Sequence, residues 1–193
     1  FLPVLGQQTR RHHRLMHILI APGAFKHSLG AAQVAQAIAR GLERSGLPAT
    51  YHLMPIADGG NGTLDAFLAN GGQRIPITVE NPLGQAIEAA YGLLPDGQTA
   101  VIEMALASGI ELTLQPDAMR ASTYGTGQLM RAALEHGITR MIIGLGGSAT
   151  TDGGAGCLQA LGVRLMDSHG HDIARGGAGL AQLERIDTSG LDS

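Results

Sequence analysis

The sequence MIIGLGGSATTDGGAG, from Met141 to Gly156, decides the fold that we expect for this chain. Residues 141–144 predict a short buried strand, and residues 155–161 predict a helix. The turn between them holds glycines, small hydroxyl residues and one carboxylate, Asp152. Glycine lets a backbone approach a ligand closely, and N–H groups at a helix N-terminus bind phosphate oxygens. The stretch therefore predicts an anion site, the alternative being a tight crossover without a ligand.

Composition limits the classes of protein to which the chain can belong. Its 193 residues allow one domain, or one and part of another. With 44% apolar and 3% aromatic residues, we expect an aliphatic, alanine-rich core. The net charge of −3 without a basic stripe argues against nucleic-acid binding, and no apolar run approaches membrane-spanning length. The single cysteine, Cys157, excludes an internal disulfide framework and predicts a reducing, cytoplasmic location.

Residues 1–15, FLPVLGQQTRRHHRL, differ in character from the rest of the chain. The segment is apolar first and basic second, which is the reverse of a signal peptide. Met16 then precedes a clean strand pattern. We therefore expect Met16 to be the natural start and residues 1–15 to be a disordered leader or added sequence.

Two strand–loop–helix units come after the leader. Strands are predicted at 17–21 and 51–56, and helices after Ser28, which is a suitable N-cap, and at 64–68. This order is typical of a parallel α/β sheet. The pattern then changes to three strands at 74–79, 86–93 and 99–104, and the turn sequences between them predict antiparallel pairing in a second domain from about residue 75.

The last third of the chain returns to an alternating pattern. A helix is predicted over 126–136, then the strand of the deciding stretch, and a further strand over 162–166. The polar residues 167–172 predict a hairpin turn, and no regular element is predicted after them. The fold class is therefore α/β, with a parallel-sheet domain over 16–74 and a second mixed α/β domain over 75–193.

The motif D-G-G-x-G occurs twice, beginning at Asp58 and at Asp152. Each copy follows a predicted strand and precedes a helix, and ligands of open α/β sheets lie at the carboxyl ends of strands. Two such turns predict two carboxylates facing one cleft. The alternative for each copy is an aspartate that only caps its helix.

Other candidate residues lie at the same predicted end of the sheet. Lys26 and Ser28 follow the first strand, where a lysine can act as a point charge on phosphate. Glu103 ends an apolar strand, where a buried carboxylate needs a partner or a ligand. The stretch 122–127, STYGTG, predicts an anion or substrate loop, or ordinary helix capping.

A competing pattern lies within the deciding stretch. Residues 144–149 fit G-x-G-x-x-A, and Asp167 ends the next strand, which imitates a dinucleotide-binding fingerprint. Against it, Asp152-Gly153-Gly154 falls where such a helix would be running. A nicotinamide-dependent oxidoreductase is therefore kept as the second hypothesis.

Six segments in order resemble the type I bacterial glycerate kinases. They are APGAFKHSL (21–29), PIADGGNGT (55–63), NPLG (81–84), IEMALASGI (102–110), STYGTGQL (122–129) and IIGLGGSATTDGGAGCLQALG (142–162). The resemblance implies two α/β domains, the first Rossmann-like and incomplete here, and transfer of the γ-phosphoryl group of ATP to D-glycerate, with 2-phosphoglycerate favoured as product. The family's later motifs are missing, so we expect a truncated form corresponding to the N-terminal half.

The resemblance also implies roles for the candidate residues, with ATP and Mg²⁺ as cofactors. Asp58 and Asp152 are candidates for binding Mg²⁺ and for accepting the glycerate hydroxyl proton, and Lys26 for facing phosphate or the glycerate carboxylate. The phosphate-binding candidates are Gly146, Gly147, Ser148, Gly153 and Gly154. The substrate-binding candidates are Ser28, Gly59, Gly60, Glu103 and Thr126.

A third hypothesis concerns the 193-residue chain alone. An incomplete parallel sheet leaves an unpaired edge and uncovered apolar faces, and such surfaces associate. A non-catalytic fragment that associates with itself is therefore the interpretation that competes with an active enzyme.

Overall fold

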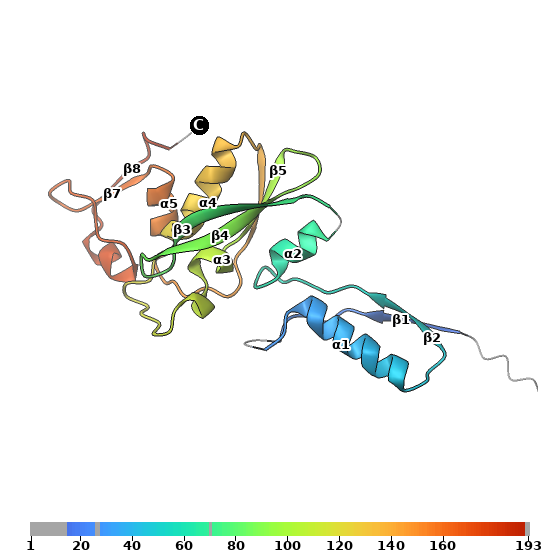
Figure 1. Ribbon diagram of the computed structural model, residues 1–193. Coiled ribbons are helices and arrows are strands. Elements are labelled where there is room, and N and C mark those ends of the chain that lie inside the picture. The colour runs from blue at the N-terminus through green and yellow to red at the C-terminus, as the bar shows by residue number, and fades with distance from the viewer. Residues whose placement is uncertain (1–14, 26–27, 70, 192–193) are drawn as a thin grey trace, which may run out of the picture.

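The computed structural model describes residues 15–25, 28–69 and 71–191 (Figure 1). Apart from Leu15, the predicted leader lies outside the described residues, and so does Lys26. Figure 1 shows a small body built from the first two strands and the first helix, and a larger one built from the rest of the chain.

The smaller body is one parallel β-α-β unit. It contains β1 (Met16–Ile20), α1 (Ala31–Arg44) and β2 (Ala49–Leu53). The two strands pair in parallel with Ile18 beside Tyr51, which confirms the predicted order. Ile20 packs against Ala35 and Ala39 of the helix, so one face of the strand pair is covered by α1. The Rossmann-like assignment of residues 16–74 stays a prediction.

The N-terminus of α1 differs from the prediction. The N-cap is Gly30, whose amide donates to Oε1 of Gln33 at 3.1 Å, so the prediction that Ser28 caps this helix is wrong. The amide of Ser28 instead donates to the carbonyl of Phe25 at 3.0 Å, which closes a turn before the helix begins.

The larger body is built on a four-stranded sheet of order β3-β4-β5-β6. The strands are β3 (Gln73–Glu80), β4 (Ala86–Leu93), β5 (Thr99–Glu103) and β6 (Arg140–Gly144). The first three pair antiparallel, as predicted, and β6 runs parallel to β5. This sheet is therefore mixed, and the parallel pair at one side carries the deciding stretch.

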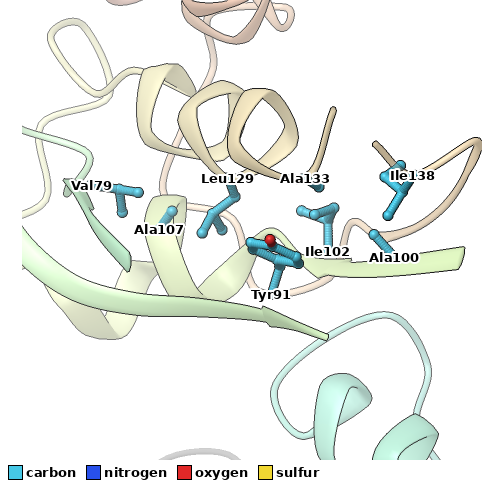
Figure 2. Packing of buried hydrophobic residues seen from close by; sticks show 8 residues of the cluster. All are labelled: Val79, Tyr91, Ala100, Ile102, Ala107, Leu129, Ala133 and Ile138. Atoms are coloured by element: carbon cyan, nitrogen blue, oxygen red, sulfur yellow. The ribbon is translucent and has the colours of Figure 1, made fainter. Parts of the chain in front are cut away.

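Helices cover both faces of this sheet (Figure 1). On one face α4 (Tyr124–Glu135) buries Leu129 and Ala133 against Ile102 and Tyr91 (Figure 2). Burying each large side chain of this kind contributes about 1.5–3 kcal/mol. On the other face α2 (Thr63–Leu68) buries Leu64 against the strands. The domain boundary predicted at residue 75 is untested, but these contacts group α2 with the second sheet.

The remaining elements come after β5 and β6. Short helices α3 (Ala105–Ser108) and η1 (Ile110–Leu112) follow β5, and neither was predicted. After β6 come α5 (Ala155–Ala160), β7 (Arg164–Met166), η2 (Gly177–Gln182) and β8 (Arg185–Asp187). β7 and β8 pair antiparallel. The expectation of no regular element after residue 172 is therefore wrong.

The strand of the deciding stretch is less buried than predicted. Ile142 and Ile143 are 37% and 40% exposed, because β6 is the edge strand of its sheet. The segment 144–149 also does not open a helix, since α5 begins only at Ala155 after a left-handed Gly154. A dinucleotide-binding turn of the kind considered above is therefore not formed.

Candidate active site

Two glycine turns meet through their backbones at the end of β6. The amide of Gly146 donates a 2.7 Å hydrogen bond to the carbonyl of Gly59. A Cβ atom on Gly146 would lie 2.6 Å from the Cα and N atoms of Gly60, and one on Gly144 would lie 2.7 Å from the carbonyl oxygen of Gly59. Glycine is needed at both positions because no side chain fits between the turns.

Asp58 is the exposed carboxylate at this junction. It lies in the loop after β2, and its Oδ1 accepts a hydrogen bond from the amide of Gly60 at 3.2 Å. The side chain is otherwise open to solvent. It can therefore contact a ligand without any rearrangement of the core.

Glu103 ends β5 and is buried, with 2% exposure. Its Oε1 accepts a hydrogen bond from the amide of Gly62 at 3.2 Å, and its Oε2 accepts one from the amide of Leu64 at 2.8 Å. The partner that this carboxylate was expected to need is therefore the N-terminus of α2. Burial raises the pKa of Glu103, and the two amides lower it by part of that amount. Its assignment to substrate binding stays a prediction.

Asp152 is also buried, with 1% exposure. Its Oδ2 accepts from the amide and hydroxyl of Thr123, at 2.8 and 3.0 Å, and from the amide of Gly156 at 3.1 Å. Oδ1 accepts from the amide of Gly154 at 3.1 Å. The expectation that this side chain faces an open cleft is wrong, because the N-termini of α4 and α5 enclose it.

The two D-G-G-x-G motifs are thus not equivalent in the structure. In the first, the N-cap is the fifth residue, Gly62, and the aspartate lies before the helix. In the second, the N-cap is the third residue, Gly154, and the aspartate lies within reach of the first helical amides. The prediction that both carboxylates face one cleft is therefore wrong, because Asp58 is exposed and Asp152 is buried.

The phosphate-binding candidates lie partly at the surface. Gly147, Ser148 and Gly153 are exposed, whereas Gly146 and Gly154 are half-buried. The loop is held by the segment after α3, since the amide of Ile110 donates a hydrogen bond of 2.9 Å to the carbonyl of Gly147. The Ser148 hydroxyl lies 2.8 Å from that of Thr150. Their role with phosphate stays a prediction.

The other candidates lie apart from one another. Thr126 is buried and its hydroxyl lies 2.7 Å from that of Ser108, so it holds α4 against α3. Ser28 is exposed in the loop after β1. Gly59 and Gly60 carry the contact with Gly146 described above.

The sequence did not single out two residues that contribute to the site. Thr123 binds Asp152 and accepts from the amide of Cys157 at 2.9 Å. Asn61, in the Asp58 turn, donates to Oε2 of Glu111 at 2.8 Å. Thr123 could have been found from its place in a hydroxyl-rich turn before a helix. For Asn61, the only sequence feature that pointed to the site was its position within the first D-G-G-x-G motif.

The fold and site together define a mixed α/β protein in which two glycine turns meet beside one exposed carboxylate. None of the helices in the described part of the chain is long and apolar enough to cross a membrane. The sequence model of the glycerate kinase family matches residues 18–193. The chain therefore belongs to the glycerate kinase family, which confirms the resemblance.

Individual relatives agree with this assignment. The chain is 50% identical over 181 residues to a glycerate kinase of Bacillus subtilis (strain 168), covering 92% of this chain and 47% of the relative. It is 49% identical over 181 residues to the glycerate 2-kinase of Escherichia coli (strain K12), again covering 92% and 47%. The chain spans about half the length of the curated relatives it matches.

A solved structure shares the fold. It is a crystal structure of a protein from Salmonella typhimurium LT2 whose description proposes that it is glycerate kinase 2, and it is 49% identical in sequence with a TM-score of 0.74. The match covers 93% of this chain and 49% of that one. The overall fold is therefore shared over nearly all of the chain.

Proposed function

We propose that this protein acts in the transfer of the γ-phosphoryl group of ATP to D-glycerate. The observation that supports this most is the contact between the Asp58 turn and the loop 144–148, which brings an exposed carboxylate beside exposed glycine and serine residues. The name of the Escherichia coli relative, glycerate 2-kinase, favours 2-phosphoglycerate as the product. The single cysteine favours a cytoplasmic location.

Phosphoryl transfer depends mainly on positioning and on neutralising charge. Asp58 is the group that we assign to the substrates, because its carboxylate is exposed at the junction of the two turns. As a base it accepts the proton of the attacking glycerate hydroxyl. Gly147, Ser148 and Gly153 are the exposed members of the loop that we assign to the phosphates.

The residues present also fit a Mg²⁺ ion, which binds one or two carboxylates together with phosphate oxygens and waters. As the alternative to acting as the base, Asp58 would hold it, because its oxygens are accessible at the surface. When bound, the ion neutralises charge on the phosphate oxygens. Asp152 does not fit as a ligand, since both of its oxygens accept hydrogen bonds from enclosed protein groups.

The test is a coupled assay of ADP release with D-glycerate, ATP and Mg²⁺. It is run on this chain and on a chimera that joins residues 16–193 to the part of the Escherichia coli relative beyond the alignment. A cooperative melt shows first that the chimera is folded. We expect ADP release that depends on glycerate and a 2-phosphoglycerate signal by NMR. A folded chimera without glycerate-dependent release would contradict the proposal.

A further inference from the structure

We propose that Glu103 is a positioning residue that holds the Asp58 turn in place for phosphoryl transfer. The inference rests on the proposed function, because it assigns the chemistry to Asp58. Glu103 itself points into the protein and reaches the turn through backbone amides. Its role is therefore distinct from the substrate binding expected from the sequence.

The Asp58 turn is held at two points by neighbouring strands. At its start, Gly59 accepts from the amide of Gly146 in the loop after β6. At its end, the amides of Gly62 and Leu64 donate to Glu103 on β5. Glu103 pairs directly with Gly144 in the sheet register, so both points belong to one rigid pair of parallel strands.

A carboxylate from another strand is needed because α2 does not cap itself. The first amides of a helix have no partner within the helix, and a side chain at the N-cap usually accepts from them. Here the N-cap is Gly62 at φ 90°, a conformation that favours glycine, so no cap side chain is available. The hydroxyl of Thr63 is already used, since it donates to the carbonyl of Gly60 at 2.6 Å.

Burial makes this arrangement specific to a carboxylate. Glu103 accepts one amide on each oxygen, whereas glutamine in the same place would present an NH₂ group to one of them. A buried NH₂ group that faces a backbone N–H is unfavourable, so we expect the turn to move until the two donors are apart. Because a displacement of about 1 Å at a reacting group can lower the rate about a hundredfold, the effect would appear at Asp58.

The test compares Glu103→Gln with Glu43→Gln, which removes an exposed carboxylate on α1. In the chimera we expect Glu103→Gln to lower kcat about tenfold or more with a smaller change in KM, and Glu43→Gln to leave both unchanged. In an Asp58→Asn background the Glu103→Gln effect on kcat should disappear, because the positioned group is gone. An equal loss in both backgrounds would overturn the inference.

Amide hydrogen exchange provides a readout that does not need activity. In the 193-residue chain, Glu103→Gln should speed exchange at Gly62 and Leu64 and leave α4 unchanged. If this variant does not fold, Glu103→Asp, which keeps the charge but is one methylene shorter, replaces it. Unchanged exchange at Gly62 and Leu64 would overturn the inference. If the parent chimera transfers no phosphate, the proposed function fails and the role of Glu103 in phosphoryl transfer fails with it, whereas exchange still decides whether Glu103 holds the Asp58 turn.

Discussion

The amide of Gly146 donates a hydrogen bond of 2.7 Å to the carbonyl oxygen of Gly59. This bond joins the loop after β6 to the loop after β2, which belong to different sheets. The contact is backbone to backbone, so its geometry depends on the absence of side chains. The relative position of Asp58 and the glycine loop is therefore set by glycine residues.

Replacing Gly146 by alanine should disrupt this contact. The new Cβ would lie 2.6 Å from Gly60, so one turn must move, at a cost of about 1–3 kcal/mol for overpacking. We expect a lower melting temperature and, in the chimera, kcat lowered about a hundredfold. The control is Gly41→Ala in α1, where a Cβ meets nothing within 4 Å and a gain of about 0.4–1 kcal/mol is expected. Equal behaviour of the two variants would contradict the argument.

Asp58→Asn should affect chemistry and leave stability nearly unchanged. The side chain is exposed and makes one hydrogen bond, from the amide of Gly60, which asparagine can also accept. Loss of the charge should lower kcat in the chimera on the order of a hundredfold or more, as for loss of a general base. Kinetics and melting curves on the same preparation check this. A kcat near that of the parent would leave Asp58 as a turn residue only.

Asp152→Asn should behave differently and destabilise the protein. Asp152 is buried, its two oxygens accept at least four hydrogen bonds from neighbouring amides and a hydroxyl, and an amide NH₂ in its place would face an N–H donor. An unsatisfied or opposed buried group costs about 1–3 kcal/mol. Urea unfolding of the two aspartate variants side by side gives the comparison. If Asp152→Asn matched the parent in unfolding free energy, the buried network would not have the role assigned to it.

The contrast between these aspartates shows what the sequence could predict. The two D-G-G-x-G motifs look alike, but the helix begins two residues earlier, relative to the aspartate, in the second copy. That shift decides whether the carboxylate is exposed or caps a helix. It depends on the packing of α5 against α4, which motif spacing does not record. The same holds for Glu103, whose partners come from a separate helix.

Most elements were predictable because their patterns are local. Apolar periodicity and turn residues located β4 at residues 86–93, and α1 and α4 to within a few residues. The burial of β6 was not predictable, since an apolar strand has the same pattern in the middle and at the edge of a sheet. The elements after residue 172 are short and held by long-range contacts, so their sequence carries little periodic signal.

The free energy of unfolding of the protein should depend on pH through the titration of Glu103. Its native pKa is raised above 4.5 by burial, so the native state binds this proton more tightly than the unfolded state. The stabilisation from this group is therefore present below pH 4.5 and is lost as pH rises through the native pKa. Asp65 raises the pKa further and Arg74 lowers it.

Glu103→Gln removes this titration and provides the reference. The unfolding free energy of the parent minus that of the variant should fall as pH rises from about 4 towards 7. Urea unfolding at several pH values measures the difference, and the contributions of other carboxylates cancel in it. A difference that stayed constant or grew with pH would contradict the raised pKa.

The isolated 193-residue chain should associate with itself. Large apolar side chains are exposed on both bodies: Leu19 is 57% exposed on β1, and Ile142 and Leu145 are 37% and 71% exposed on β6 and the loop after it. In the described part of the chain β6 pairs with β5 alone, so its outer edge can accept another strand. Exposed apolar surface beside an open edge favours association between copies.

Size-exclusion chromatography with light scattering tests this directly. We expect a mass above that of a monomer that rises with concentration, and a return towards monomer in the double variant Leu19→Lys and Ile142→Lys, because a lysine on an edge strand opposes pairing. The control is Leu114→Lys, whose side chain is fully exposed in a bend that is not part of a strand, and which should leave the mass unchanged. A sharp monomer peak of the unsubstituted chain together with a cooperative melt would show that these apolar faces are stable in water on their own.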